Sequence, residues 1–315
     1  MKHHLNPRLR QAACHAAVLA LLGMSTHRLA GQEQVPSVPE AKTEMKQLGS
    51  KFLAPGYKSS WSPDGTRLVF GKVSDGLQIM DLTSGKVTDL VDSGKDPAWS
   101  AKDVIAYVRG DREQEEVWLV HSDGSKAKKL HDGGVPVWSK RGTTLFFHSR
   151  KEGEILAIAI DADEADAPTE FFPMPSTWYP AISPTGTHIA YFQDQRLVVV
   201  DQVSGKEKKE WSLPGPGGGL AAWSSDGKRL AFAGFGTDDK VGFWVLNPET
   251  GAAVRVSAGS FTMPAWSPDG SKLAMDWRGE GERQIWMIET KVLDTLSDSR
   301  KDLPELDSSV SRPSK

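Results

Sequence analysis

Histidines are the first candidates for catalytic or metal-binding chemistry in this sequence. Four of the eight lie within the first thirty residues, and the remaining four are His121, His131, His148 and His188. A catalytic zinc site needs three protein ligands that converge on one point. The repeat described below places His121 and His188 on one face of the predicted fold and His131 and His148 on the other. We therefore expect no metal site.

Other sequence patterns typical of catalysis or cofactor binding are also missing. Asp238-Asp239 lacks the ligand spacing of a calcium loop, and the glycines at 217–219 do not follow the strand-to-helix pattern of a nucleotide-binding loop. The sequence contains no Gly-x-Ser-x-Gly nucleophile motif. We expect no cofactor and assign no catalytic residue, although an active site built without these motifs stays an alternative.

Aromatic and arginine side chains are the better candidates for function. Of eleven tryptophans, five belong to the repeat and three to predicted core strands, which leaves Trp178, Trp211 and Trp277. The repeat places them on one face, together with Tyr57, Tyr179, Phe261, Arg109, Arg112, Arg150, Arg278 and His148. Exposed aromatic rings and arginines are typical anchors of interfaces, so we predict that these residues bind a partner. The alternative, with almost equal weight, is that the rings fill the core at that face.

The positions of these residues follow from a repeat that runs through most of the chain. The segment KSSWSPDGTRLVFGK at 58–72 resembles MPAWSPDGSKLAMDW at 263–277. Four further copies contain the same serine, which directly follows a tryptophan in three of them and an isoleucine in the fourth. The six copies are spaced 38, 39, 44, 41 and 43 residues apart, and they are aligned on Trp61, Trp99, Trp138, Ile182, Trp223 and Trp266. A period near forty residues, with glycine turns and β-branched runs, is typical of propeller blades.

Each copy predicts one blade of four strands. A short inner strand ends in Trp-Ser, a Ser-Pro-Asp-Gly turn reverses the chain, and the third strand is almost wholly apolar, as in Phe243–Leu246. We predict an all-β, six-bladed β-propeller of four-stranded blades. The repeat tryptophans should be core residues between blades. The sixth blade lacks a clear second turn, so we expect an N-terminal strand at 44–48 to complete it, with residues 292–296 as the alternative.

Strand order gives the propeller two distinct faces. The turns between first and second strands and between third and fourth strands lie on one, which we call the tight-turn face. The connections between second and third strands and between blades lie on the other, the variable-loop face. The candidate binding residues all map to the variable-loop face.

The two ends of the chain differ from the repeat. Residues 1–30 run from basic to apolar to small residues, in the order of a secretory signal peptide. We expect a linker at 31–43, the propeller at 44–296 and a disordered tail at 297–315. Cys14, the only cysteine, lies within the predicted signal. That segment carries four basic and no acidic residues, so its removal changes the formal charge from −3 to −7. An acidic, exported chain argues against nucleic acid and membrane insertion.

The Ser-Pro-Asp-Gly-x-x-Leu-Ala motif with a following apolar strand resembles the propeller repeat of the periplasmic TolB family. It also resembles the propeller of prolyl oligopeptidases and dipeptidyl peptidases. The resemblance covers roughly residues 44–296, without the α/β domain that precedes the TolB propeller and without a hydrolase domain. It implies an isolated TolB-like propeller and carries over no catalytic residue.

We therefore predict an exported, monomeric, non-enzymatic propeller in the periplasm or secreted. It would bind a protein or a peptidoglycan-associated envelope partner through the variable-loop face. Two alternatives stay open. One is an enzyme, a glycan lyase or hydrolase with its active site in the funnel, and the other is a structural remnant of a peptidase propeller.

Overall fold

The computed structural model describes residues 38–296 apart from short gaps. The gaps are 112, 150, 152, 162–163, 166, 174–179, 194–195, 202–206, 213–217, 235–241, 259–260 and 279–280. The chain divides into two units, 1–34 and 35–315, and every described residue belongs to the second. The predicted signal peptide, most of the predicted linker and the predicted tail lie outside the described residues.

The first three blades follow one another along the chain, each as an antiparallel sheet. Blade one contains β2 (Tyr57–Trp61), β3 (Arg67–Gly71), β4 (Leu77–Asp81) and β5 (Val87–Val91). Blade two contains β6 (Lys95–Trp99), β7 (Val104–Arg109), β8 (Glu116–His121) and β9 (Lys128–Asp132). Blade three contains β10 (Gly134–Trp138), β11 (Thr144–Ser149), β12 (Glu154–Asp161) and β14 (Thr169–Pro173), with the short β13 (Glu164–Ala165) also paired to β12.

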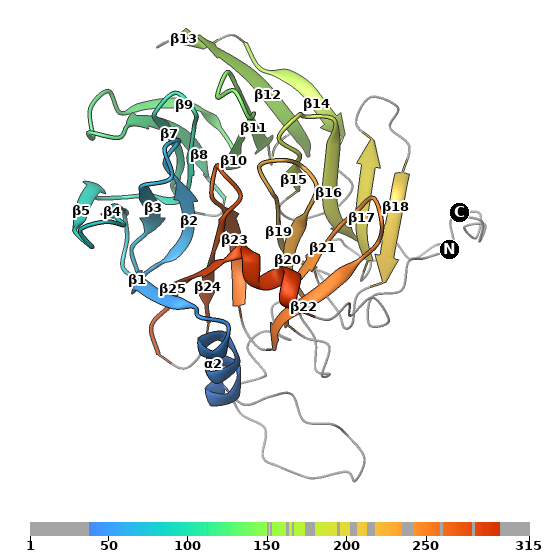
Figure 1. The fold of residues 1–315 in the computed structure, drawn as a ribbon. Helices are drawn as coiled ribbons and strands as arrows, with labels where there is room; N and C mark the ends of the chain where they lie inside the picture. Colours follow the sequence, from blue (N-terminus) through green and yellow to red (C-terminus); the bar gives the residue numbers. More distant parts are fainter. Residues whose placement is uncertain are drawn as a thin grey trace, which may run out of the picture. The chain divides into compact units, whose positions relative to one another are not determined.

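The next two blades repeat this order, and the last one departs from it. Blade four contains β15 (Ala181–Ile182), β16 (His188–Gln193), β17 (Arg196–Asp201) and β18 (Glu207–Ser212). Blade five contains β19 (Gly218–Trp223), β20 (Leu230–Gly234), β21 (Gly242–Leu246) and β22 (Ala253–Ala258). Blade six contains β23 (Phe261–Trp266), β24 (Lys272–Trp277), β25 (Gln284–Glu289) and β1 (Lys51–Pro55). The predicted six-bladed, four-stranded propeller is therefore confirmed, and Figure 1 shows the labelled first strands β2, β10, β15, β19 and β23 toward the centre of the ring.

An N-terminal strand does complete blade six, but the predicted residues were wrong. The closing strand is β1, which pairs antiparallel with β25 from Lys51↔Met287 to Pro55↔Gln284. Residues 44–47 instead end helix α2 (Val38–Gln47), and the alternative segment at 292–296 lies largely in the short helix η2 (Thr290–Thr295). The prediction failed because an isolated polar segment with few apolar residues does not distinguish helix from strand.

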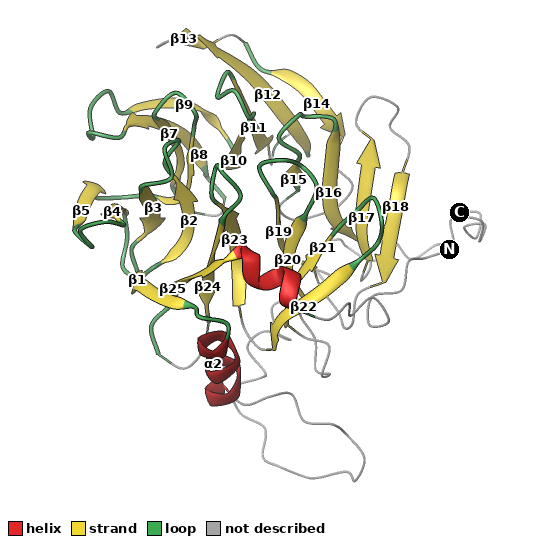
Figure 2. Cartoon of the chain, in the orientation of Figure 1, coloured by secondary structure: helices red, strands yellow, loops and turns green. Residues whose placement is uncertain are grey.

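The two helices cover the side of blades five and six (Figure 2). Met45 of α2 is fully buried in the same apolar cluster as Val256 of β22 and Leu293 of η2. Burial of this side chain anchors the segment that leads into β1. The chain before the closing strand is therefore part of the propeller's packing, although the sequence predicted a linker as far as residue 43.

The shared serine of each repeat holds the tight turn between the first two strands. In blade six, the backbone N–H of Lys272 donates to Ser267 Oγ at 2.9 Å, and that hydroxyl donates to Asp269 Oδ1 at 2.6 Å. Ser62 makes the same pair of bonds in blade one, where its hydroxyl is the main cause that lowers the pKa of Asp64 to about 2. The motif is therefore turn architecture, as its turn chemistry predicted.

Candidate functional site

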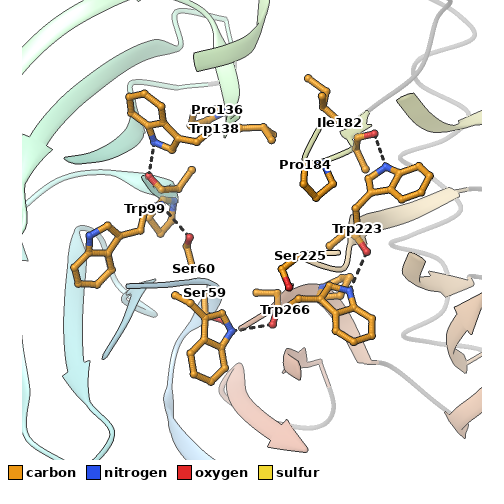
Figure 3. Close-up of a pocket in the computed structure, with 18 of the residues that line it drawn as sticks. Ser59, Ser60, Trp99, Pro136, Trp138, Ile182, Pro184, Trp223, Ser225 and Trp266 are labelled. Atoms are coloured by element: carbon orange, nitrogen blue, oxygen red, sulfur yellow. Dashed lines mark hydrogen bonds between the residues drawn. The ribbon is translucent and has the colours of Figure 1, made fainter. Parts of the chain in front are cut away.

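A ring of tryptophans joins consecutive blades around the central channel. In four junctions, an indole Nε1–H donates to a backbone carbonyl of the preceding blade's first strand. These bonds are Trp61 to Ala265 at 2.9 Å and Trp138 to Ala98, Trp223 to Ala181 and Trp266 to Ala222, each at 3.0 Å. In Figure 3 the labelled tryptophan rings point away from the channel. The tryptophans therefore connect blades, as the sequence predicted, and leave backbone and short side chains on the channel wall.

Two junctions lack this bond, for different reasons. Between blades one and two, the indole of Trp99 donates instead to Asp103 of its own blade at 2.9 Å, while its backbone N–H donates to Ser60 Oγ at 2.9 Å. Between blades three and four, Ile182 replaces the tryptophan and has no side-chain donor. The backbone N–H of Lys140 donates across that junction to the carbonyl of Pro184, at 3.2 Å.

The central channel encloses a cavity of about 540 Å³. Its wall consists of the first strands and the following turn residues, and most of these are alanine, proline, serine and tryptophan. Lys58 and Lys140 are the two ionisable residues in the described lining. Lys58 precedes its repeat tryptophan and lies toward the variable-loop face, whereas Lys140 follows its repeat tryptophan and lies toward the tight-turn face.

The first strands are strained where they enter the channel from the variable-loop face. The residue three positions before the repeat tryptophan has a positive φ in four blades. These residues are Lys58 at 46°, Asp96 at 53°, Val135 at 55° and Met263 at 51°. The pairing of each strand shifts register at this point, as in a β-bulge. A left-handed conformation is costly for any of these residues, most of all for β-branched Val135, and such strain concentrates at functional sites.

A buried carboxylate, Asp276, organises one side of this mouth. Asp276 is completely buried and accepts hydrogen bonds from two donors. The backbone N–H of Lys58 lies 2.8 Å from both carboxylate oxygens, and Arg283 Nη2 donates to Oδ2 at 2.8 Å. The backbone bond crosses from blade one to blade six, so Asp276 connects the seam at which the ring closes.

Burial raises the pKa of Asp276 to about 7, because removal from water disfavours the charged carboxylate. The charge of Arg283 and the Lys58 N–H act in the opposite direction. Burial also raises the pKa of Tyr57, whose ring lies 4.4 Å from the Arg283 guanidinium carbon. The charge state of this side of the mouth is therefore sensitive to pH near neutrality.

Charged pairs continue from Asp276 into blade two. Lys58 Nζ lies 3.1 Å from Asp96 Oδ2, and both side chains are less than a fifth exposed. Next to them, Lys95 Nζ lies 3.0 Å from Glu115 Oε1. Blades three and six present Val135 and Met263 at the position that Lys58 and Asp96 occupy in blades one and two. This position of the mouth is thus charged in blades one and two and apolar in blades three and six.

A second cavity, of about 560 Å³, opens beside blade two. It is lined by strand ends and connections of blades two and three, at Glu113, Gln114, Glu115, Glu116, His131, Asp132, Gly133, Ser149 and Lys151. Two of these side chains already take part in a local ion-pair network, because Lys129 Nζ lies 2.7 Å from both Glu116 Oε1 and Asp132 Oδ1. Among the described residues, no group of three or more histidine, cysteine or acidic side chains is arranged to hold a metal ion.

The structure brings three predicted binding residues to the charged mouth or its neighbourhood. Tyr57 stacks under Arg283, Arg278 is exposed at the end of β24, and Arg109 lies over the half-buried Trp118 at 4.5 Å. His148 is half-buried at the end of β11, opposite Gly134. Trp211 belongs to β18, where it pairs with Leu197.

The other predicted binding residues are buried or lie outside the described residues. Trp277 and Phe261 are 0% and 1% exposed, and their rings pack 4.6 Å apart at 56°. Their burial favours the core alternative. Arg112, Arg150, Trp178 and Tyr179 lie outside the described residues, so their role stays a prediction.

Sequence reasoning missed the charged cluster of Lys58, Asp96, Asp276 and Arg283. A signal for Asp276 was present, because the equivalent second-strand positions in blades one to three hold Gly71, Val108 and His148. An acidic residue inside the otherwise apolar segment LAMDW is unusual for a strand covered on both faces. Lys58 and Asp96, three positions before Trp61 and Trp99, were not unusual in the sequence, because they lie next to predicted connections where charged residues are common.

The comparisons with known proteins agree with this fold. No protein-family model matches the chain. A TolB homologue from Chlorobium luteolum is 29% identical over 109 residues, which are 32% of this chain and 25% of that protein. TolB from Acinetobacter baumannii superposes with a TM-score of 0.54 at 17% identity, over 79% of this chain and 67% of that one. XC5397 from Xanthomonas campestris, a gluconolactonase, gives 0.55 at 12% identity, over 76% and 87%. The chain is a TolB-like six-bladed β-propeller.

Proposed function

We propose that this protein is an exported binding module that captures a protein or peptidoglycan-associated envelope partner through its variable-loop face. The observation that carries the proposal is the one-sided mouth of the channel. Buried and half-buried charges at Asp276, Lys58, Asp96 and Arg283 gather at the seam and blade two, beside an apolar wall. Surfaces that combine fixed charges with apolar walls suit recognition of a partner of defined polarity.

Catalysis is the competing function, because one of the structural neighbours is a gluconolactonase. That likeness is at 12% identity and concerns the fold alone. The only ionisable side chains in the described wall of the channel are Lys58 and Lys140. Asp276, whose pKa burial raises to about 7, lies behind Lys58 and Arg283, which favours a positioning role over contact with substrate.

Export to the periplasm, or secretion, is part of the proposal. It rests on the basic-to-apolar order of residues 1–30 and on the likeness to TolB. Neither helix that the structure describes has the length and apolar character needed to span a membrane. We further propose that the protein does not bind nucleic acid, because its net charge is acidic after signal removal, and that it acts as a monomer.

Capture from envelope extracts with variants of the two faces tests the proposal. Tyr57→Ala and Arg109→Ala change half-buried side chains of the variable-loop face, and we expect each to reduce capture of the partner. Lys140→Glu and Thr185→Glu change the tight-turn face and should leave capture unchanged. Loss of capture in the tight-turn variants alone would refute the assigned face. Turnover of a glycan or lactone by the purified protein would refute the binding function.

A further inference from the structure

Two arginines face each other at the end of the β24–β25 hairpin in blade six. The last paired residues of that ladder are Trp277 and Gln284, so Arg278 and Arg283 occupy the next pair of opposite positions. Like charges in opposite positions of two antiparallel strands destabilise the pair. A hairpin selected only for stability would place an acid or a neutral residue at one of them.

Among the described residues, a carboxylate pairs with only one of these two arginines. Arg283 directs Nη2 to the buried Asp276, but its Nε is buried without a hydrogen-bond partner. Arg278 is exposed, and no described carboxylate forms an ion pair with it. Glu282, the adjacent acid, is exposed and forms no ion pair with either arginine among the described residues. Partial burial and, after it, the charge of the nearby Arg283 lower the pKa of Arg278, as expected for a guanidinium group beside a like charge.

Arg283 is also held in place before any ligand arrives. Its guanidinium is fixed by the 2.8 Å bond to Asp276 and lies 4.4 Å above the ring of Tyr57. Fixed guanidinium groups lose little conformational entropy on binding and present their remaining N–H donors in a defined plane. Arg278 supplies a second guanidinium on the exposed side.

We propose that Arg278 and Arg283 together bind a single carboxylate carried by an acidic segment of the partner. The charges nearby favour one carboxylate over a phosphate dianion. Lys58 is paired with Asp96 and Arg283 with Asp276, so Arg278 is the member of this cluster that has no ion pair among the described residues, and its single charge matches one carboxylate. This inference rests on the proposed binding function and names the chemistry of the group that is recognised.

Titration of the full chain with short blocked peptides tests the inference. The probes are acetyl-Gly-Asp-Gly-amide, the neutral acetyl-Gly-Asn-Gly-amide and inorganic phosphate, each at low ionic strength up to tens of millimolar. The readout is the Nε–Hε resonance of Arg283 in the NMR spectrum. We expect the aspartyl peptide to shift this resonance and saturate, and the asparaginyl peptide to bind about tenfold more weakly or not at all.

The variant Arg278→Gln should weaken aspartyl-peptide binding by about tenfold without lowering the melting temperature, since the side chain is exposed and the change removes a like charge opposite Arg283. Lys140→Gln, at the opposite mouth, is the matched control and should bind as the parent does. Equal binding of the acidic and neutral peptides, no shift at all, or an unaffected Arg278→Gln variant would overturn the inference. Binding of phosphate in preference to the peptide would also overturn it.

The two proposals fail separately. If Tyr57→Ala abolishes capture of the envelope partner but Arg278→Gln affects neither capture nor peptide binding, the binding function stands and the carboxylate site falls. If the peptide binds as expected and no variable-loop variant affects capture, the carboxylate site stands. The proposal that the envelope partner binds the variable-loop face is then refuted.

Discussion

The backbone N–H of Lys58 lies 2.8 Å from both carboxylate oxygens of Asp276, across 218 positions of sequence. This contact joins the first and last blades beside the entrance of the central channel. Lys58 adopts a left-handed conformation with φ of 46°, and its side chain pairs with Asp96 of the next blade. Ring closure and the charged mouth are therefore the same piece of structure, so a change in the charge of Asp276 acts on both.

The first prediction follows from the raised pKa of Asp276. The pKa is about 7 in the folded protein and 3.8 for the reference carboxyl, so folding takes up a proton between these values. The free energy of unfolding should fall as pH rises through this window and level off above it, by roughly 4 kcal/mol at most. Urea unfolding at pH values from 4.5 to 8.5 measures the trend.

Asp276→Asn isolates this contribution. The variant cannot ionise at this position, so the difference in unfolding free energy between parent and variant should follow the protonation of Asp276. The parent should lose stability relative to the variant as pH rises from 5 to 8. A pH-independent difference would show that Asp276 does not titrate in this range. The opposite slope would show that Arg283 and Lys58 keep its pKa below that of the unfolded chain.

The second prediction concerns the tryptophan ring. Trp138→Phe keeps an aromatic ring between blades two and three but leaves the carbonyl of Ala98 without its indole donor. We expect a loss of about 1 kcal/mol, and about 3 kcal/mol or more for Trp138→Ala. Trp223→Phe and Trp266→Phe remove the same kind of bond at two other junctions and should lose about as much. Thermal or urea unfolding compares the variants, and unchanged stability of Trp138→Phe would show that the indole bond between blades does not stabilise the ring.

The repeat made the fold predictable from sequence because its physical causes are local. Serine, aspartate and glycine define the tight turn through bonds within a few residues, as Ser267 and Asp269 do. An apolar run such as that of β21 has to be covered on both faces. Six copies of the same local information predict the blade count without any long-range contact.

The closing strand and the charged cluster were not predictable in the same way, because their causes are not local. β1 is a strand only because β25 offers an unpaired edge, and its residues Lys51–Pro55 have weak strand character alone. The role of Asp276 depends on Lys58 from the other end of the chain. A single sequence indicates that such a residue is unusual but not which distant group it meets.

The third prediction revises what Trp277 does. The sequence predicted a binding residue, with a core residue as the alternative, and the indole is fully buried against Phe261. We now expect Trp277→Ala to lower the free energy of unfolding by about 3–5 kcal/mol. Unfolding in urea measures the loss, with Arg278→Gln next to it as an exposed control. A variant with unchanged stability and reduced partner capture would restore the binding role.

The last prediction concerns the segment that closes the ring. A chain that begins at Lys51 loses helix α2 and the buried Met45, and should lose about 2–5 kcal/mol of stability while still folding. A chain that begins at Tyr57 also loses β1 and exposes the edge of β25. We expect this shorter chain to aggregate or to melt far earlier, because an unpaired sheet edge recruits other strands.

Addition of a peptide with the sequence of residues 51–56 should partly restore the melting temperature of the shorter chain, since the peptide can pair with β25 as β1 does. A chain that ends at Leu296 should melt as the full chain does, because the predicted tail at 297–315 has almost no apolar residues to bury. If the chains beginning at Lys51 and at Tyr57 melt alike and the peptide has no effect, β1 does not stabilise the ring.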